Sequence, residues 1–81
     1  MSDFPRALVS ARIAQAEVYD LSARLDNAIA ARNRAVSAAW RARPGGLCWG
    51  GFVGDLNEGL GEGARLSYAG WRNAEREGRG A

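Results

Sequence analysis

Arginine and tryptophan are the residues of this chain best equipped for chemistry, and the chemistry they suit is binding. All 11 basic residues are arginines, and the chain has 3 tryptophans. A guanidinium group binds carboxylate or phosphate through paired hydrogen bonds and stacks on aromatic rings, and both residue types are enriched at binding hot spots. A GC-rich coding sequence would also raise arginine, alanine and glycine together, so composition alone does not select a ligand.

The chain lacks the usual equipment for catalysis and for cofactors. Without histidine or lysine, a nucleophile has no partner base, and the glycine-rich segment has no Walker-type lysine. Cys48 is the only cysteine, which excludes an intrachain disulfide and the usual zinc and haem sites. We therefore predict a protein that is not an enzyme and that holds no cofactor and no metal.

Charge and hydropathy also limit the partners. The formal net charge of +2 is too small to attract nucleic acid or a membrane through the overall field. The amino terminus has no basic segment followed by an apolar one, as a secretory signal would. Residues 44–54, the longest uncharged stretch, are too few and too rich in glycine to span a bilayer. We expect a cytoplasmic protein with no membrane partner.

The candidate binding residues gather around the glycine-rich segment 44–54. Trp49 and Phe52 lie among its glycines, and Trp40 and Arg41 shortly precede it. One interpretation is a mobile apolar tip that inserts into a groove on another protein. The other is a wide turn whose aromatic side chains plug the open end of a helical hairpin. The predicted partner-binding residues are Arg34, Trp40, Arg41, Arg43, Trp49 and Phe52, with Trp71 as their buried support.

Residues 4–43 are predicted to form one long helix. Asp3 can cap it, Pro5 suits its first turn, no glycine interrupts it, and Pro44 ends it. Alanine-rich positions at heptad spacing form a stripe typical of close helix packing. Arg32 lies inside this stripe, where either its stem packs while its head reaches solvent or an acid, or it sets the register with a partner. A break near Asp26 would divide the helix in two.

A second helix is predicted over residues 55–77, after the turn at 44–54 and before a frayed tail at 78–81. Asp55 is the expected N-cap, and Leu56, Leu60 and Trp71 lie in phase on one face. Gly63 falls on the same face, where we expect two helix backbones to touch. Alternatively, residues 59–63 form a loop and the helix begins near Ala64.

Together these elements predict a single all-α domain, an antiparallel two-helix hairpin completed by self-association or by a partner. Basic residues at the end of the first helix would meet acidic residues at the start of the second. These residues are Arg32, Arg34, Arg41 and Arg43 on the first helix and Asp55, Glu58 and Glu62 on the second. Exposed Val18, Leu21 and Leu25 would form the patch for self-association.

The predicted function is that of a non-enzymatic interaction module that binds and blocks or adapts a larger protein assembly. Small size and an arginine-only set of bases are typical of phage or mobile-element inhibitors of host machinery, anti-CRISPR proteins among them. A nucleic-acid-binding helical hairpin and a structural subunit of an assembly such as a virion are the alternatives. Nucleic acid is less favoured, because the arginines do not form one stripe on a helical wheel and the long turn does not match a helix-turn-helix.

Overall fold

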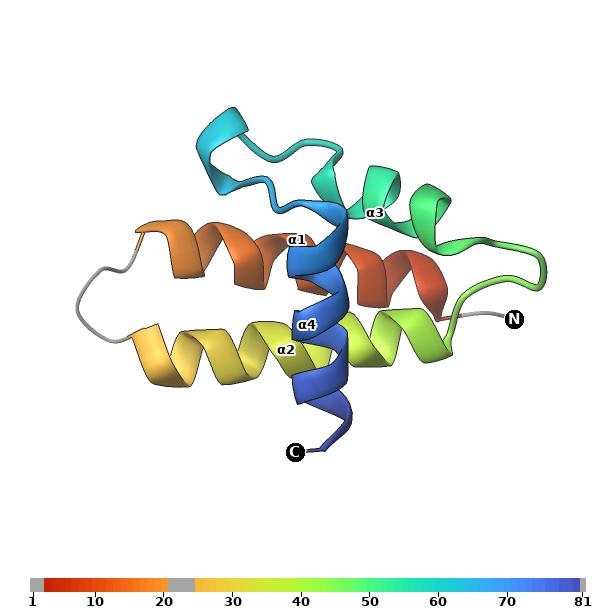
Figure 1. Ribbon diagram of the computed structural model, residues 1–81, viewed down its shortest axis with the longest axis horizontal. Helices are drawn as coiled ribbons and strands as arrows, with labels where there is room; N and C mark the ends of the chain where they lie inside the picture. The colour runs from red at the N-terminus through yellow and green to blue at the C-terminus, as the bar shows by residue number, and fades with distance from the viewer. Residues whose placement is uncertain (1–2, 21–24, 81) are drawn as a thin grey trace.

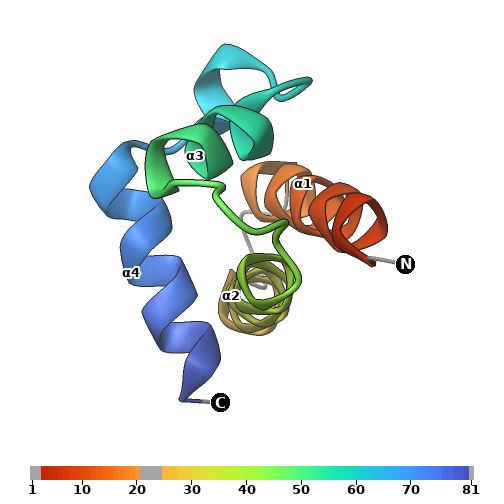
Figure 2. The ribbon, with the colours of Figure 1, turned by 90° about the vertical axis from the view of Figure 1, so that its right-hand side faces the viewer.

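The computed structural model describes residues 3–20 and 25–80, and within them it is all helix and loop, which confirms the all-α class. Figure 1 shows α1 and α2 side by side along the long axis, with α4 crossing them. Figure 2 shows α4 at one side of the molecule, reaching from the level of α3 to α2. The elements are α1 (Phe4–Asp20), α2 (Leu25–Arg41), α3 (Trp49–Asn57), the 3₁₀ turn η1 (Glu62–Ala64) and α4 (Tyr68–Arg79).

The prediction of one continuous helix over 4–43 is wrong, and the alternative of a break near Asp26 is closer to the structure. Such a helix would be about 60 Å long, whereas the longest extent of the Cα positions is 38 Å. Folding back lets the alanine-rich halves cover each other, and Ala11, Val36 and Ala39 become fully buried at 0% exposure. Of the predicted self-association patch, Val18 is half-buried, while Leu21 and the side chain of Leu25 lie outside the described residues.

The predicted second helix over 55–77 is also wrong, because α3, η1 and α4 take its place. The helix α3 begins at Trp49, inside the predicted turn, and its N-cap is Cys48, whose Sγ accepts a hydrogen bond from the Gly51 N–H at 3.4 Å. The helix α4 begins only at Tyr68, after the Ser67 hydroxyl cap, and continues through the predicted frayed tail to Arg79. The glycines at 59–63 therefore belong to the connection between α3 and α4, as the loop alternative expected.

The close approach of two backbones occurs at Gly78, not at Gly63. A Cβ atom on Gly78 would lie 2.5 Å from the carbonyl carbon of Asn33 and 3.0 Å from the amide nitrogen of Arg34, both on α2. A Cβ on Gly63 would meet only the side chain of Tyr19. Only glycine lets α4 lie this close to α2, so Gly78 sets the position of α4 against the rest of the fold.

Two amide side chains, buried Gln15 and half-buried Asn57, stabilise the connection between α3 and α4. Gln15 of α1 donates from Nε2 to the carbonyl oxygen of Ala64 at 2.5 Å. Asn57 donates from Nδ2 to the Leu66 carbonyl at 3.1 Å, and its Oδ1 accepts from the indole N–H of Trp71 at 2.9 Å. Trp71 is fully buried, as predicted. These bonds replace the backbone pairing that an irregular segment lacks.

Among residues 3–20 and 25–80, Arg32 has no acid partner, and its head bonds to two amide side chains. Its Nη1 donates to Gln15 Oε1 at 2.6 Å and its Nε donates to Asn33 Oδ1 at 2.8 Å. Burial lowers the pKa of the Arg32 guanidinium from its usual value. Arg32 is half-buried, and the partner of its head is the neutral amide of Gln15 and not the acid that was one of the expectations.

Candidate functional site

An aromatic cluster joins the end of α2 to the beginnings of α3 and α4. The ring centroids of Trp40 and Trp49 lie 4.9 Å apart, edge to face, and each ring is within 5.3 Å of Phe52. Phe52 is fully buried, and Trp49 is only 5% exposed. Phe52 and Trp49 are therefore part of the hydrophobic core, as the interpretation of this segment as a plug expected.

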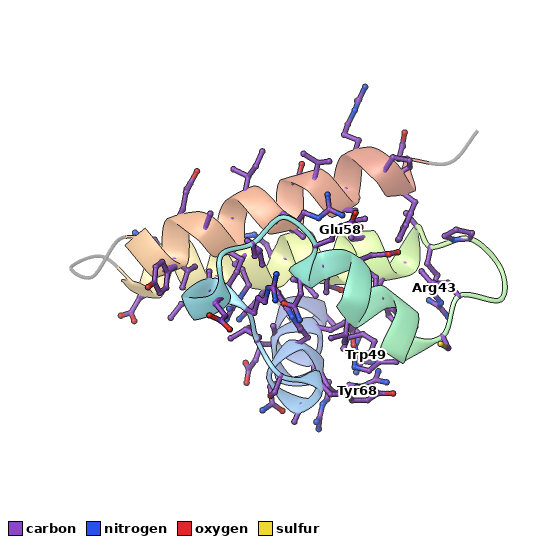
Figure 3. All side chains as sticks on the ribbon, turned by 90° about the horizontal axis from the view of Figure 1, so that it is seen from above. Arg43, Trp49, Glu58 and Tyr68 are labelled. Atoms are coloured by element: carbon purple, nitrogen blue, oxygen red, sulfur yellow. The ribbon has the colours of Figure 1, made fainter. Side chains whose placement is uncertain are left out.

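Two arginines, Arg43 and Arg72, lie over rings of this cluster, and Figure 3 labels Arg43 and Trp49. The guanidinium carbon of Arg43 is 3.7 Å from the centroid of Trp40, and that of Arg72 is 4.0 Å from the centroid of Trp49 and 6.0 Å from that of Trp40. Stacking fixes the plane of a guanidinium while leaving hydrogen-bond donors at its edge. Arg43 uses one donor on the Trp40 carbonyl oxygen at 2.7 Å. Within residues 3–20 and 25–80, neither arginine forms an ion pair.

The outward side of α4 continues this surface. The helix buries Trp71, Ala74, Glu75 and Gly78 and turns its opposite side to solvent. Arg72 is half-buried, and the exposed residues of the helix are Tyr68, Ala69, Asn73, Arg76, Glu77 and Arg79. The first two turns of this side expose no acidic residue, because Glu75 is only 1% exposed and its Oε2 lies 3.1 Å from Arg79 Nε. We call the set formed by Arg43, Tyr68, Arg72, Asn73 and Arg76 the cationic face.

Charge is divided unevenly between the elements, which a single helical wheel could not show. Taken together, α2, α4 and the residues just after α2 carry more bases than acids, whereas α1 carries two of each sign and α3 and η1 carry one acid each. The bases are Arg32, Arg34, Arg41, Arg43, Arg72, Arg76 and Arg79, beside the acids Asp26, Glu75 and Glu77. On the other elements the acids are Glu17, Asp20, Asp55 and Glu62, beside the bases Arg6 and Arg12.

The predicted pairing of the α2 arginines with the acids near α3 is wrong. Glu58 instead pairs with Arg12 of α1 at 3.6 Å, and Arg12 also donates from Nε to the Asp55 carbonyl oxygen at 2.9 Å. In the part of the chain that the structure describes, Arg34 and Arg41 have no acidic partner. Their charge is therefore not neutralised within the fold.

The structure brings together four of the six predicted site residues: Trp40, Arg43, Trp49 and Phe52. Arg41 is exposed at the end of α2, and Arg34 is exposed two turns earlier, beside the crossing of α4. That these residues bind a partner stays a prediction. Sequence reasoning left out Tyr68 and Arg72, and the signal that could have found them is the Ser67 cap followed by a polar stripe along α4.

Comparisons with models of protein families, with curated proteins and with solved structures find no match to this chain. Among the described residues, no helix is both long and apolar enough to cross a bilayer.

Proposed function

We propose that this protein is a non-catalytic binding protein and that the cationic face binds nucleic acid. The observation that carries the proposal is the set of arginines on this face that form no ion pair among the described residues, two of them held over tryptophan rings. The sequence favours a protein partner over nucleic acid. We prefer nucleic acid to a protein partner because bases are concentrated on α2 and α4, and phosphate contacts supply most of the affinity for nucleic acid.

The chemistry of the stacked arginines suits phosphate. Arg43 and Arg72 are ordered before binding by their contacts with Trp40 and Trp49, so less side-chain entropy is lost when they meet an anion. A guanidinium offers paired donors at its edge, which match the oxygens of a phosphate. Arg76 and Asn73 extend the row along α4, where Arg76 Nη2 already donates to Asn73 Oδ1 at 3.3 Å.

The salt dependence of binding tests this proposal. A fluorescent 20-base-pair duplex would be titrated with the protein at 50 to 200 mM salt, and anisotropy would report the Kd. Two phosphate contacts, from Arg43 and Arg72, predict a log–log slope of about −1.8, which weakens binding about 12-fold over this range. Arg43→Ala should reduce the slope by about 0.9.

Arg6→Ala is the matched control, because it removes the same charge from the exposed side of α1. Its slope should equal that of the unmodified protein. Absence of binding to the duplex at 50 mM salt, or an equal loss from Arg6→Ala and Arg43→Ala, would count against a nucleic-acid function.

A protein partner is the second candidate, and exposed Tyr68 is the observation that favours it. Its side chain is 58% exposed and its ring lies 6.3 Å from that of Trp49, beside the stacked Arg72. Tyrosine and arginine side by side are typical of binding hot spots. In this case the protein would block or adapt a larger assembly, as phage or mobile-element inhibitors of the anti-CRISPR type do. A complex that survives nuclease treatment but is lost in Tyr68→Ala would support this function.

A further inference from the structure

We infer that α4 enters the major groove of duplex DNA and that Asn73 and Arg76 contact base edges there. This inference rests on the proposed nucleic-acid function and goes further, because it assigns duplex over single strand and base reading over phosphate contact alone. Three observations carry it: the placement of α4, the residue types on its outward side, and the arginines that already lie over the rings of Trp40 and Trp49.

The placement of α4 leaves one whole side of the helix open along its length. Its buried side packs on α2 through Trp71, Ala74 and Gly78, and α4 stands at one side of the molecule (Figure 2). An α-helix with its side chains is about 10–12 Å wide, and the major groove is about 12 Å wide. The helix is 12 residues long, and no other helix covers its outward side in either ribbon view (Figures 1 and 2).

The outward side chains suit the donor and acceptor pattern of the major groove. Asparagine pairs with the N6 and N7 positions of adenine, and arginine with O6 and N7 of guanine. Asn73 and Arg76 are both exposed, and each bonds only to the other in the described part of the chain. Ala69, one turn before Asn73, is small enough to let the helix approach the floor of the groove.

Trp40 and Trp49 are poorly placed to stack on unpaired bases. Single-strand binding relies on free aromatic faces as platforms. Arg43 lies over the ring of Trp40 and Arg72 over that of Trp49, which is also buried. Only Tyr68 offers an open ring beside the cationic face. One platform with a row of cations along a straight helix fits a duplex better than a single strand.

The spacing of the two reading residues predicts the spacing of the bases. Three residues along a helix span about 4.5 Å, and consecutive base pairs are about 3.4 Å apart. Asn73 and Arg76 should therefore contact an adenine and a guanine that lie one or two steps apart. Arg43, held on Trp40, is then placed to contact the phosphate backbone.

Selection from a pool of duplexes with 10 random base pairs tests the inference. The unmodified protein should enrich a motif that contains adenine and guanine within two steps. Asn73→Ala should lose the preference at the adenine position by about 5- to 150-fold and Arg76→Ala that at the guanine position, as expected for a lost bidentate contact. Arg6→Ala should enrich the original motif. Both reading residues are exposed, so their variants should melt at the temperature of the unmodified protein.

The outcomes separate this inference from the proposed function. Salt-dependent binding with no enriched motif, or a motif that both variants keep, would overturn base reading while leaving nucleic-acid binding intact. Tighter binding to a 20-nucleotide single strand than to the duplex would also overturn it. Failure to bind either form at 50 mM salt would overturn both proposals.

Discussion

Replacing Gly78 with alanine should separate α4 from α2 and destabilise the protein. The added Cβ would lie 2.5 Å from the carbonyl carbon of Asn33 and 3.0 Å from the amide nitrogen of Arg34. Ordinary carbon contacts begin at about 3.5 Å, so the two backbones must separate by about 1 Å. The atoms in the way belong to the α2 backbone, and no rotamer change can relieve the overlap.

The expected size of the effect follows from two opposing contributions. Forcing a methyl group into a packed contact costs about 1–3 kcal/mol. Alanine favours a helix over glycine by up to about 1 kcal/mol, but Gly78 is the second-last residue of α4, where that gain is smaller. The net loss should be about 1–2 kcal/mol, which lowers the Tm of a domain of this size by about 4–16 °C.

Thermal unfolding followed by circular dichroism measures this change, with Gly61→Ala as the matched control. Gly61 has nothing within 4 Å of a built Cβ, and its φ of −63° is open to alanine. Gly61→Ala should therefore raise the Tm slightly, by restricting the unfolded chain. Equal or higher Tm values for both variants would refute the close packing of α4 on α2.

Two further substitutions test the fastening of the connection and the cap of α3. Gln15→Leu leaves the Arg32 Nη1 donor and the Ala64 carbonyl without their partner, so the free energy of unfolding in urea should fall by about 1–3 kcal/mol. A urea midpoint equal to that of the unmodified protein would show that these two hydrogen bonds are dispensable. Cys48→Ser should preserve or strengthen the cap on the Gly51 N–H, whereas Cys48→Ala should reduce the stability by up to about 1 kcal/mol and so lower the Tm. A higher Tm for alanine than for serine would contradict the capping role.

The helical class and the burial of particular residues could be predicted from the sequence. The phase of the apolar positions identifies Leu56, Leu60 and Trp71 as residues of one buried set, and all three are buried. This succeeds because periodicity depends on the local geometry of a helix, whichever partner covers the apolar side. The same phase misled on continuity, because Leu56 belongs to α3 and Trp71 to α4, with an irregular connection between them.

The helix boundaries and the site could not be predicted in full, because they depend on tertiary contacts. Residues 58–67 are stabilised by Gln15 from α1, 49 positions from its partner, and by Asn57 at the end of α3, and no local pattern indicates such bonds. The stacking of Arg72 on Trp49 joins residues 23 positions apart in sequence, on different helices. The aromatic cluster could be predicted because Trp40, Trp49 and Phe52 lie near one another in sequence. The contribution of α4 could not, because it depends on how α4 packs against the other helices.

The measurement that tests the central claim most directly is a map of backbone amide shifts by NMR while a 16-base-pair duplex is added at low salt. The claim is that the outward side of α4 binds nucleic acid. Binding through this side predicts the largest shifts at Ala69, Arg72, Asn73 and Arg76, with smaller ones at Arg43. Shifts confined to the exposed side of α1, or no shifts at equimolar duplex, would contradict it.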